Sequence, residues 1–148
     1  MRSPAARLRQ ALERRLRPRP QRVLVVDDSR DIREMWVEWL KIWGFSVDQA
    51  VNGFDAIERA AASPPDLVLM DLWMPGLDGF AATERLKANA ALAGVPVLAL
   101  SADTMPSTPQ RALAAGCDAF LPKPVSCDDL LEQIRTTLRG TYAPERPA

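Results

Sequence analysis

The chain has 148 residues, of which 47% are hydrophobic and 26% charged, and its formal net charge is zero. These values are ordinary for a single globular domain. The absence of histidine excludes a catalytic histidine, and no apolar run approaches the ~20 residues that cross a bilayer. Cys117 and Cys127 are too few for a disulfide framework, and no secretory signal precedes them, so we expect reduced thiols and a cytoplasmic protein.

The N-terminal segment is strongly basic. Residues 1–22 hold eight Arg and one Glu, a charge of +7, whereas residues 23–148 hold eleven Lys and Arg against eighteen Asp and Glu, a charge of −7. Residues 5–16 are predicted to form a short helix with three leucines on one stripe, namely Leu8, Leu12 and Leu16. Pro18 and Pro20 then end this helix and make a stiff spacer.

We therefore divide the chain into a basic arm or linker helix at residues 1–21, a globular domain at 22–139 and a disordered tail at 140–148. The role of the arm stays open at this point. A solvated tail or an interdomain linker is the plainest interpretation, and the charge of the arm would also suit contact with nucleic acid or acidic lipid.

Strands and helices are predicted to alternate through the domain. Apolar runs predict five strands, at residues 22–27, 45–50, 66–71, 95–100 and 118–121. Amphipathic segments predict five helices, at residues 29–43, 54–62, 78–89, 109–116 and 126–139. Ser29 is the expected N-cap of the first of these helices, and Gly140 is expected to end the last. This alternation predicts an α/β fold with a parallel sheet covered by helices on both faces.

Polar side chains stand at the ends of four predicted strands. They are three carboxylates, a hydroxyl and an amine: Asp27, Asp28, Asp71, Ser101 and Lys123. Because the carboxyl ends of neighbouring parallel strands meet at one edge of a sheet, where such folds bind their ligands, we expect these groups to lie together. Their chemistry indicates a site for a divalent cation and for phosphoryl transfer.

Three crowded carboxylates repel one another, and a bound divalent cation removes that cost. Mg²⁺ prefers octahedral oxygen ligands and keeps several of its waters. We expect Asp28 and Asp71 to be direct ligands, Asp27 to act through water, and the backbone carbonyl of Trp73 to be a further ligand. Asp71 can also act as a nucleophile toward a phosphoryl group, whose oxygens a nearby lysine and hydroxyl would bind.

Five short motifs occur in order: VLVVDD, LVLMD, MPGLDG, LALSA and FLPKP. The spacings are 43 residues from Asp28 to Asp71, 30 on to Ser101 and 22 on to Lys123. Together these motifs resemble the response-regulator receiver domains of bacterial two-component signalling, over about residues 22–139. The resemblance implies a flavodoxin-like, doubly wound, five-stranded parallel sheet with strand order 2-1-3-4-5 and helices on both faces, similar to that of the chemotaxis regulators.

The resemblance also implies a role for each site residue. Asp71 would be the phosphoacceptor, and it would form the Mg²⁺ pocket with Asp27 and Asp28. Ser101 and Lys123 would bind the phosphoryl group. The peptide bond that precedes Pro124 would be cis.

A conformational switch is implied as well. Ser101 would move toward the phosphoryl group, Phe120 would turn inward, and the surface formed by residues 109–139 would change. The same surface could form a homodimer, which nothing in the sequence requires. The implied partners are a histidine kinase or histidine phosphotransfer protein and a downstream protein target. No helix-turn-helix pair or zinc motif is visible, so we expect no direct DNA binding, and we expect no turnover of an external metabolite.

Two positions depart from the usual pattern of this family. Trp73 is unusually bulky two residues after the acceptor, and Asp103 is acidic two residues after Ser101. Both are expected to tune the lifetime of the phosphoryl group. The helix at 29–43 carries several tryptophans, which we interpret mainly as a core stripe, with surplus apolar width that could dock a helix of the kinase.

Other functions stay open on the sequence alone. An aspartyl-phosphate phosphohydrolase would want an acid where Trp73 stands, and a flavodoxin-like cofactor binder would need hydroxyls where Asp27 and Asp28 stand. A degenerate receiver that acts as a phosphorylation-independent interaction module, or the receiver piece of a hybrid kinase, would also fit.

Overall fold

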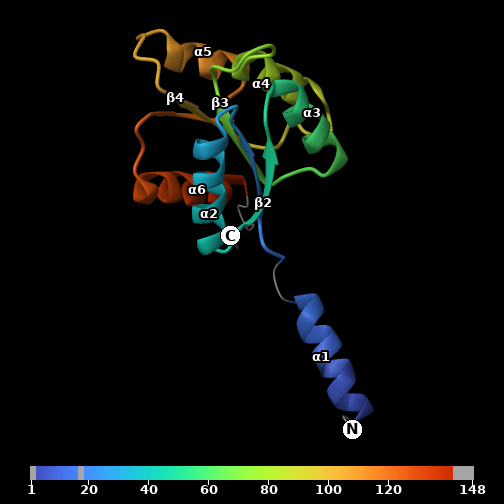
Figure 1. Ribbon diagram of the computed structural model, residues 1–148. Coiled ribbons are helices and arrows are strands. Elements are labelled where there is room, and N and C mark those ends of the chain that lie inside the picture. The colour runs from blue at the N-terminus through green and yellow to red at the C-terminus, as the bar shows by residue number, and fades with distance from the viewer. Residues whose placement is uncertain (1–2, 17–18, 142–148) are drawn as a thin grey trace, which may run out of the picture.

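A computed structural model describes residues 3–16 and 19–141, with side chains except those of residues 14–16 and 141. Its centre is a five-stranded parallel sheet of order β2-β1-β3-β4-β5 (Figure 1), which confirms the predicted fold and strand order. The strands are β1 Arg22–Val26, β2 Ser46–Ala50, β3 Leu67–Asp71, β4 Val97–Ser101 and β5 Ala119–Pro122. The helices are α1 Pro4–Leu16, α2 Arg30–Ile42, α3 Gly53–Ala62, α4 Gly79–Ala88, α5 Thr108–Ala115 and α6 Cys127–Thr141.

The predicted elements agree with the observed ones within two residues at each end, but Gly140 does not end the last helix as predicted. α6 continues through Gly140 to Thr141. A glycine inside a helix costs about 1 kcal/mol, and the burial of Leu130, Ile134 and Leu138 on the same helix outweighs that cost. The predicted disordered tail beyond this point, residues 142–148, lies outside the described part of the chain.

The sheet has a separate core on each face because successive side chains of a strand point to opposite sides. Leu24 and Val26 of β1 join one cluster, which lies beneath α3, α4 and α5. Val23 and Val25 join the other, which lies beneath α2 and α6. β3 and β4 are buried at every position, as strands covered on both faces should be.

α2 is amphipathic and presents two apolar faces. Ser29 caps its start as predicted, accepting a hydrogen bond from the backbone of Ile32. Its inner face buries Trp36, Val37 and Leu40. Four apolar side chains of α2 are instead exposed, and we call them the apolar stripe of α2: Ile32, Met35, Trp39 and Ile42.

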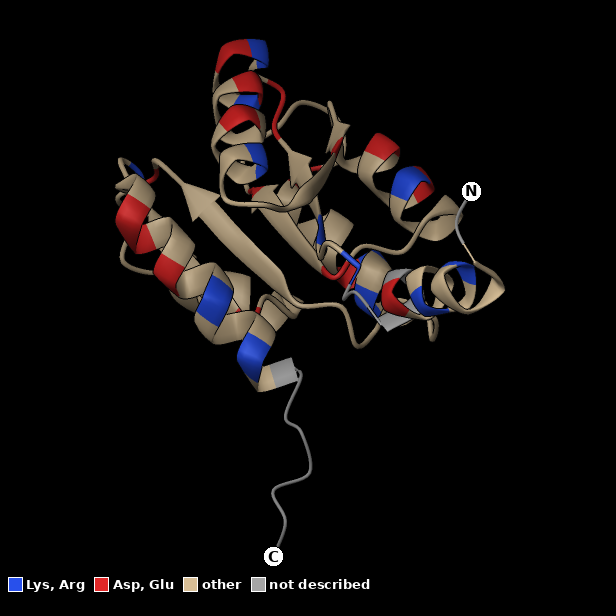
Figure 2. Cartoon of the chain, turned by 90° about the horizontal axis from the view of Figure 1, so that it is seen from below, with Lys and Arg blue, Asp and Glu red and all other residues tan. Residues whose placement is uncertain are grey.

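α1 stands apart from the domain and projects away from the amino-terminal end of the sheet (Figure 1). Leu8 and Leu12, two members of the predicted leucine stripe, are exposed on it. The side chain of the third, Leu16, is outside the described residues. The charged residues of α1 are mainly basic, with four arginines against one glutamate (Figure 2).

Candidate functional site

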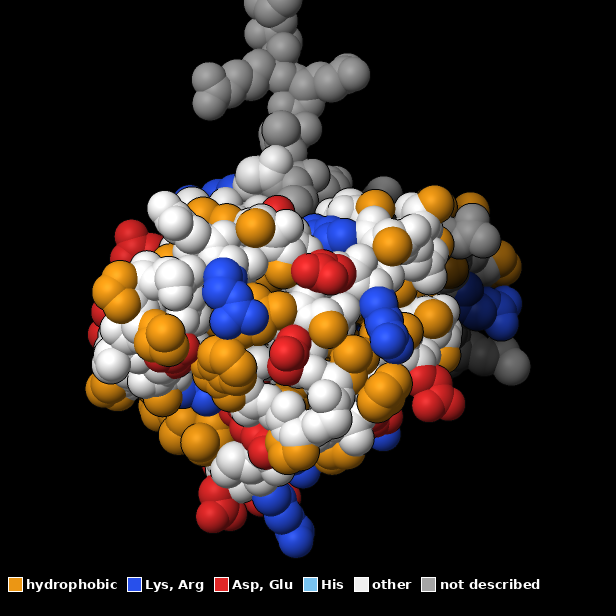
Figure 3. Space-filling view, turned by 90° about the horizontal axis from the view of Figure 1, so that it is seen from above, with side chains coloured by type: hydrophobic (Ala, Val, Ile, Leu, Met, Phe, Trp, Pro, Cys, Tyr) orange, Lys and Arg blue, Asp and Glu red, His pale blue; other side chains and the backbone are white. Residues whose placement is uncertain are grey.

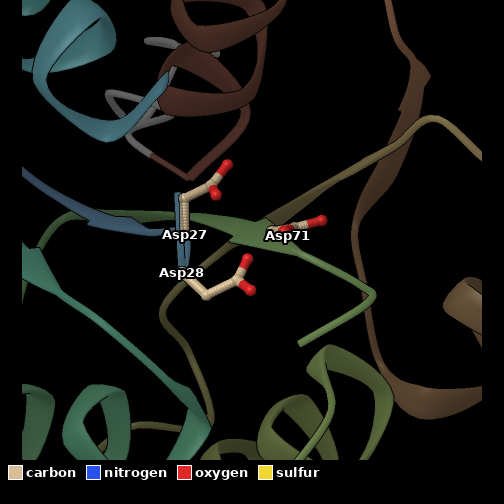
Figure 4. A group of neighbouring side chains, drawn as sticks. All are labelled: Asp27, Asp28 and Asp71. Atoms are coloured by element: carbon tan, nitrogen blue, oxygen red, sulfur yellow. The ribbon is translucent and has the colours of Figure 1, made fainter. Parts of the chain in front are cut away.

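Three carboxylates meet at the carboxyl ends of β1 and β3. One oxygen from each of Asp27, Asp28 and Asp71 lies within 4.8 Å of the others, and the side chains project to the same side of the strand ends (Figure 4). Asp27 and Asp71 are only 3% and 8% exposed, whereas Asp28 is open to solvent. Figure 3 looks down on the end of the molecule toward which the strands run, where acidic side chains lie among hydrophobic ones.

Asp71 is positioned by its strand and by the loop that follows. The loop turns back tightly, because the Gly79 backbone N–H donates to the Leu72 carbonyl at 2.9 Å. A Cβ on Gly79 would overlap the carbonyl oxygen of Asp71. Asp78 then caps α4 by accepting a hydrogen bond from the Ala81 backbone at 2.8 Å. The glycine and the cap in the MPGLDG motif therefore hold the start of α4 against the end of β3.

Asp27 is anchored to the start of α2. Its Oδ1 accepts a hydrogen bond from the backbone N–H of Ser29 at 2.9 Å. Its backbone carbonyl accepts another from Arg33 Nη1 at 2.9 Å, and Arg33 Nε also donates to Gln49 Oε1 at 3.1 Å. Arg33 thus ties α2 to the ends of both β1 and β2. Sequence reasoning did not single out this arginine, since its spacing resembles that of an ordinary exposed helix residue.

Lys123 supplies the positive charge beside the carboxylates. Its Nζ lies 3.4 Å from Asp27 Oδ2 and 3.7 Å from Asp71 Oδ1. The backbone N–H of Lys123 donates to the carbonyl of Ser101 at 2.8 Å, which holds the end of β5 beside the end of β4. The peptide bond between Lys123 and Pro124 is cis.

Burial raises the pKa of Asp71 to about 6. The charge of Lys123 acts in the opposite direction, and the neighbouring Asp27 and Asp28 add to the rise. The backbone N–H of Trp73 donates to Asp71 Oδ1 at 3.4 Å and slightly stabilises the charged form. One lysine therefore does not fully compensate these acids. Their hard oxygens suit a small divalent cation such as Mg²⁺, which would remove the repulsion among them.

Ser101 is buried at the end of β4 and is linked to α5 through Asp103. The Ser101 hydroxyl oxygen accepts a hydrogen bond from the Asp103 backbone N–H at 3.1 Å. The Asp103 carboxylate accepts from the Met105 backbone at 2.8 Å and from the Thr108 hydroxyl at 2.7 Å. These hydrogen bonds, that of Met105 most, lower the pKa of Asp103. Thr108 is the buried first residue of α5, so the contacts run from the site to that helix.

Trp73 lies in an aromatic cluster that sequence reasoning saw only in part. Its ring meets the edge of Phe80 with 5.5 Å between centroids. The guanidinium of Arg111, on α5, lies 4.3 Å from the Phe80 centroid and 5.7 Å from that of Trp73. Trp73 and Arg111 also help to lower the pKa of Asp103. No local sequence signal pointed to Arg111, because its partners lie more than 30 residues earlier in the chain.

Phe120 lies on β5, away from the carboxylates. It pairs in register with Ala99 of β4 and packs, half-buried, against the core beneath α3, α4 and α5. Phe120 is linked to the site along β5, through Lys123 three residues later, and across the sheet through β4.

The chain belongs to the response regulator receiver domain family, whose model matches residues 23–135. It is similar to response regulator MprA of Mycobacterium sp. strain KMS, with 38% identity over 128 residues that cover 86% of this chain. Solved structures of related proteins are similar to this chain as well. Chemotaxis protein CheY4 of Vibrio cholerae matches with 30% identity and a TM-score of 0.76, over 80% of this chain and 98% of that one. The receiver domain of a histidine kinase from Syntrophus aciditrophicus matches with 29% identity and a TM-score of 0.78, over 86% and 97%.

The chain spans about half the length of the curated relatives it matches, 55% for the Mycobacterium sp. protein and 52% for that of Mycobacterium leprae. The likeness therefore concerns their receiver regions. Within the described residues, no helix is both long and apolar enough to span a bilayer.

Proposed function

We propose that this receiver accepts a phosphoryl group on Asp71 from a phosphohistidine of a histidine kinase or a histidine phosphotransfer protein. The observation that carries the proposal is the meeting of three carboxylates within 4.8 Å, with the amine of Lys123 3.7 Å from Asp71. A bond would form between an Asp71 carboxylate oxygen and phosphorus while the P–N bond of the partner breaks. Because these 148 residues contain no histidine, the donor histidine must lie outside them.

Each site residue has a distinct role in this proposal. Asp27, Asp28, Asp71 and the backbone carbonyl of Trp73 would hold Mg²⁺, which when bound neutralises the carboxylates and the phosphoryl oxygens. Lys123 would contact one phosphoryl oxygen as a point charge. The Ser101 hydroxyl would donate to another while its oxygen still accepts from the Asp103 backbone N–H.

The proposed output is a change of the surface formed by α5, β5 and α6. The hydrogen bonds from Ser101 through Asp103 to Thr108 support this route, because a movement of Ser101 pulls on the start of α5. Phe120, packed beneath α5, would turn inward with it. A downstream protein or a homodimer partner would bind that surface in one of its two states. Our expectation that the chain does not bind DNA directly stays a prediction.

The kinase is proposed to dock on α2. A groove of about 310 Å³ runs from the apolar stripe of α2 to Lys123 beside the acidic cluster. It is lined by Ile32, Met35, Trp36, Ala102, Lys123, Pro124 and Val125. Apolar side chains of a partner helix would fill it and bring the partner's phosphohistidine to Asp71.

Tryptophan fluorescence tests the phosphoacceptor directly. The chain is titrated with Mg²⁺ and then with beryllofluoride, a mimic of the phosphoryl group, and is compared with Asp71→Asn. Trp73 is next to the site, so we expect a saturable response to both ligands and loss of the beryllofluoride response in the variant.

The absence of any response in the folded chain would favour the alternative, a degenerate receiver that works through constitutive protein contacts. The likeness to the receiver of a histidine kinase keeps open a second alternative, in which this receiver is one piece of a hybrid kinase.

A further inference from the structure

We infer that two copies of this chain pair, with α1 of each copy lying on the apolar stripe of α2 of the other. The inference starts from two exposed apolar surfaces. On α1, Leu8 and Leu12 are 63% and 48% exposed. On α2, Ile42 is 72% exposed, and Ile32, Met35 and Trp39 are 36%, 42% and 39% exposed. Covering either surface would lower the free energy, because it removes apolar side chains from water.

The two helices match in length and in the spacing of their apolar side chains. Both contain 13 residues, so either can cover the other from end to end. The stripe of α2 advances by three, four and three residues from Ile32 to Ile42, and Leu8 and Leu12 are four apart. Rows at this spacing interlock when two helices lie side by side.

The charges beside the two surfaces are opposite. On α1, Arg9 borders the leucine pair, three residues before Leu12. On α2, Asp31 lies four residues before Met35 of the stripe, and Glu38 lies four before Ile42. Among the described residues, neither these acids nor Arg9 take part in an ion pair. A contact between the apolar surfaces would therefore place arginine beside carboxylates, which adds orientation and specificity.

The route of the chain favours α2 of a second copy over the chain's own α2. The Gln21 carbonyl accepts from the Ser46 backbone at 2.9 Å, which fixes the arm's exit at the sheet, just beyond the end of α2. To cover its own α2, the arm would have to fold back around that helix within residues 17–20, two of which are proline. α1 instead points away from the domain (Figure 1). A two-fold pair needs no fold-back and forms the contact twice.

The test is the mass of the full chain in solution, measured by light scattering over a concentration series. We expect a change from 16.3 kDa to twice that mass as concentration rises. Leu8→Glu and Ile42→Glu should each raise the dimer dissociation constant about tenfold or more, because each buries a charge in the contact. Ala6→Glu adds the same charge two residues from Leu8, on the opposite side of α1, and should leave the constant within about twofold.

A wild-type chain that stays at 16.3 kDa throughout would overturn the inference, as would a dimer that persists in both Leu8→Glu and Ile42→Glu. Both positions are exposed, and far-UV circular dichroism verifies that the variants fold. The measurement is made with chelator and without a phosphoryl mimic, and Asp71→Asn should dimerise like the wild type. Failure of this inference is therefore distinguishable from failure of the proposed phosphoryl transfer.

Discussion

Asp71 carries opposing electrostatic demands. Its burial favours the neutral acid, whereas its proposed roles as nucleophile and metal ligand require the ionised form. Lys123, at 3.7 Å, offsets part of the cost of keeping the charge. The part of this cost that Lys123 does not offset destabilises the metal-free protein, and a bound cation would remove it. We therefore expect binding of Mg²⁺ to raise the free energy of unfolding, and the charge on Asp71 to link the two quantities.

In the absence of metal, Asp71→Asn should stabilise the protein at pH 7.5. Because burial raises the pKa of Asp71 to about 6 from an ordinary 3.8, the folded state holds this proton more tightly than the unfolded state. The contribution of Asp71 to the free energy of unfolding therefore falls as the pH rises from about 4 to about 6, and the full penalty, on the order of 2–3 kcal/mol, is present above that window. Urea denaturation with chelator at pH 4.5 and 7.5 measures the difference.

Asp28→Asn is the matched control, because it removes the same charge from an exposed position and should stabilise less. Mg²⁺ should raise the stability of the wild type and leave that of Asp71→Asn nearly unchanged. Equal stability of wild type and Asp71→Asn at pH 7.5 in chelator would show that the buried charge carries no such cost.

Trp73 and Arg111 are expected to lengthen the life of the phosphoryl group. The stack of Arg111 on Trp73 and Phe80 restrains the indole of Trp73, whose backbone contacts Asp71, and we expect the indole to hinder an attacking water. Trp73→Ala should speed the loss of the phosphoryl group about fivefold, which corresponds to a barrier lower by about 1 kcal/mol. Arg111→Ala should act in the same direction but more weakly. The decay of the phosphorylated chain, with Trp39→Ala as a control remote from Asp71, gives the answer, and unchanged decay in Trp73→Ala would dismiss the shielding role.

At the scale of elements, the loop between β3 and α4 determines how precisely Asp71 is placed. It has to return within a few residues so that α4 starts directly over the strand end. Gly79 permits this because no side chain separates it from the backbone at Asp71, and Gly76 permits the turn because its φ is +80°. The cap that Asp78 forms on the backbone of Ala81 then fixes where α4 starts. A small change of volume in this loop therefore shifts the backbone of Asp71.

Gly79→Ala should destabilise the fold by about 2 kcal/mol or more, since the new Cβ meets backbone atoms of Asp71 and Leu72 that cannot move independently. It should also weaken the response to beryllofluoride. Gly94→Ala is the matched control, because its Cβ would meet no atom within 4 Å, and its effect should stay within about 0.5 kcal/mol. Chemical denaturation of the two variants decides the matter, and equal midpoints would show that the close approach at Gly79 is relaxed in solution.

At the scale of the whole molecule, the pattern of apolar residues was a sufficient guide to the strands, the helices and the parallel sheet, whereas the strand order followed from the resemblance to receiver domains. The apolar runs of β1, β3 and β4 are long enough to mark strands covered on both faces, and their polar ends mark one edge of the sheet. Because parallel strands bring their carboxyl ends together, Asp27, Asp28, Asp71, Ser101 and Lys123 could be predicted to meet. Their individual roles stay predictions.

Contacts between elements could not be predicted in the same way. The approach of Arg111 to Trp73 depends on how α5 packs against the loop after β3, and no local pattern encodes that packing. The prediction that Gly140 ends α6 failed for a related reason. A glycine is a reliable end signal only when the helix lacks other support, and α6 has three buried apolar residues behind it.

Arg33 provides a physical link between binding of a partner at α2 and binding of a cation at the acidic cluster. It belongs to the helix that partners are proposed to grip, yet its guanidinium holds the backbone carbonyl of Asp27, a residue of the acidic cluster, at 2.9 Å. Any occupant that tilts α2 would therefore also shift Asp27, whose carboxylate belongs to the proposed cation site. By thermodynamic reciprocity, binding of the cation would then change the affinity for that occupant by the same factor. The Mg²⁺ titration would reveal this coupling as an affinity that varies with protein concentration in the wild type and is constant in Ile42→Glu.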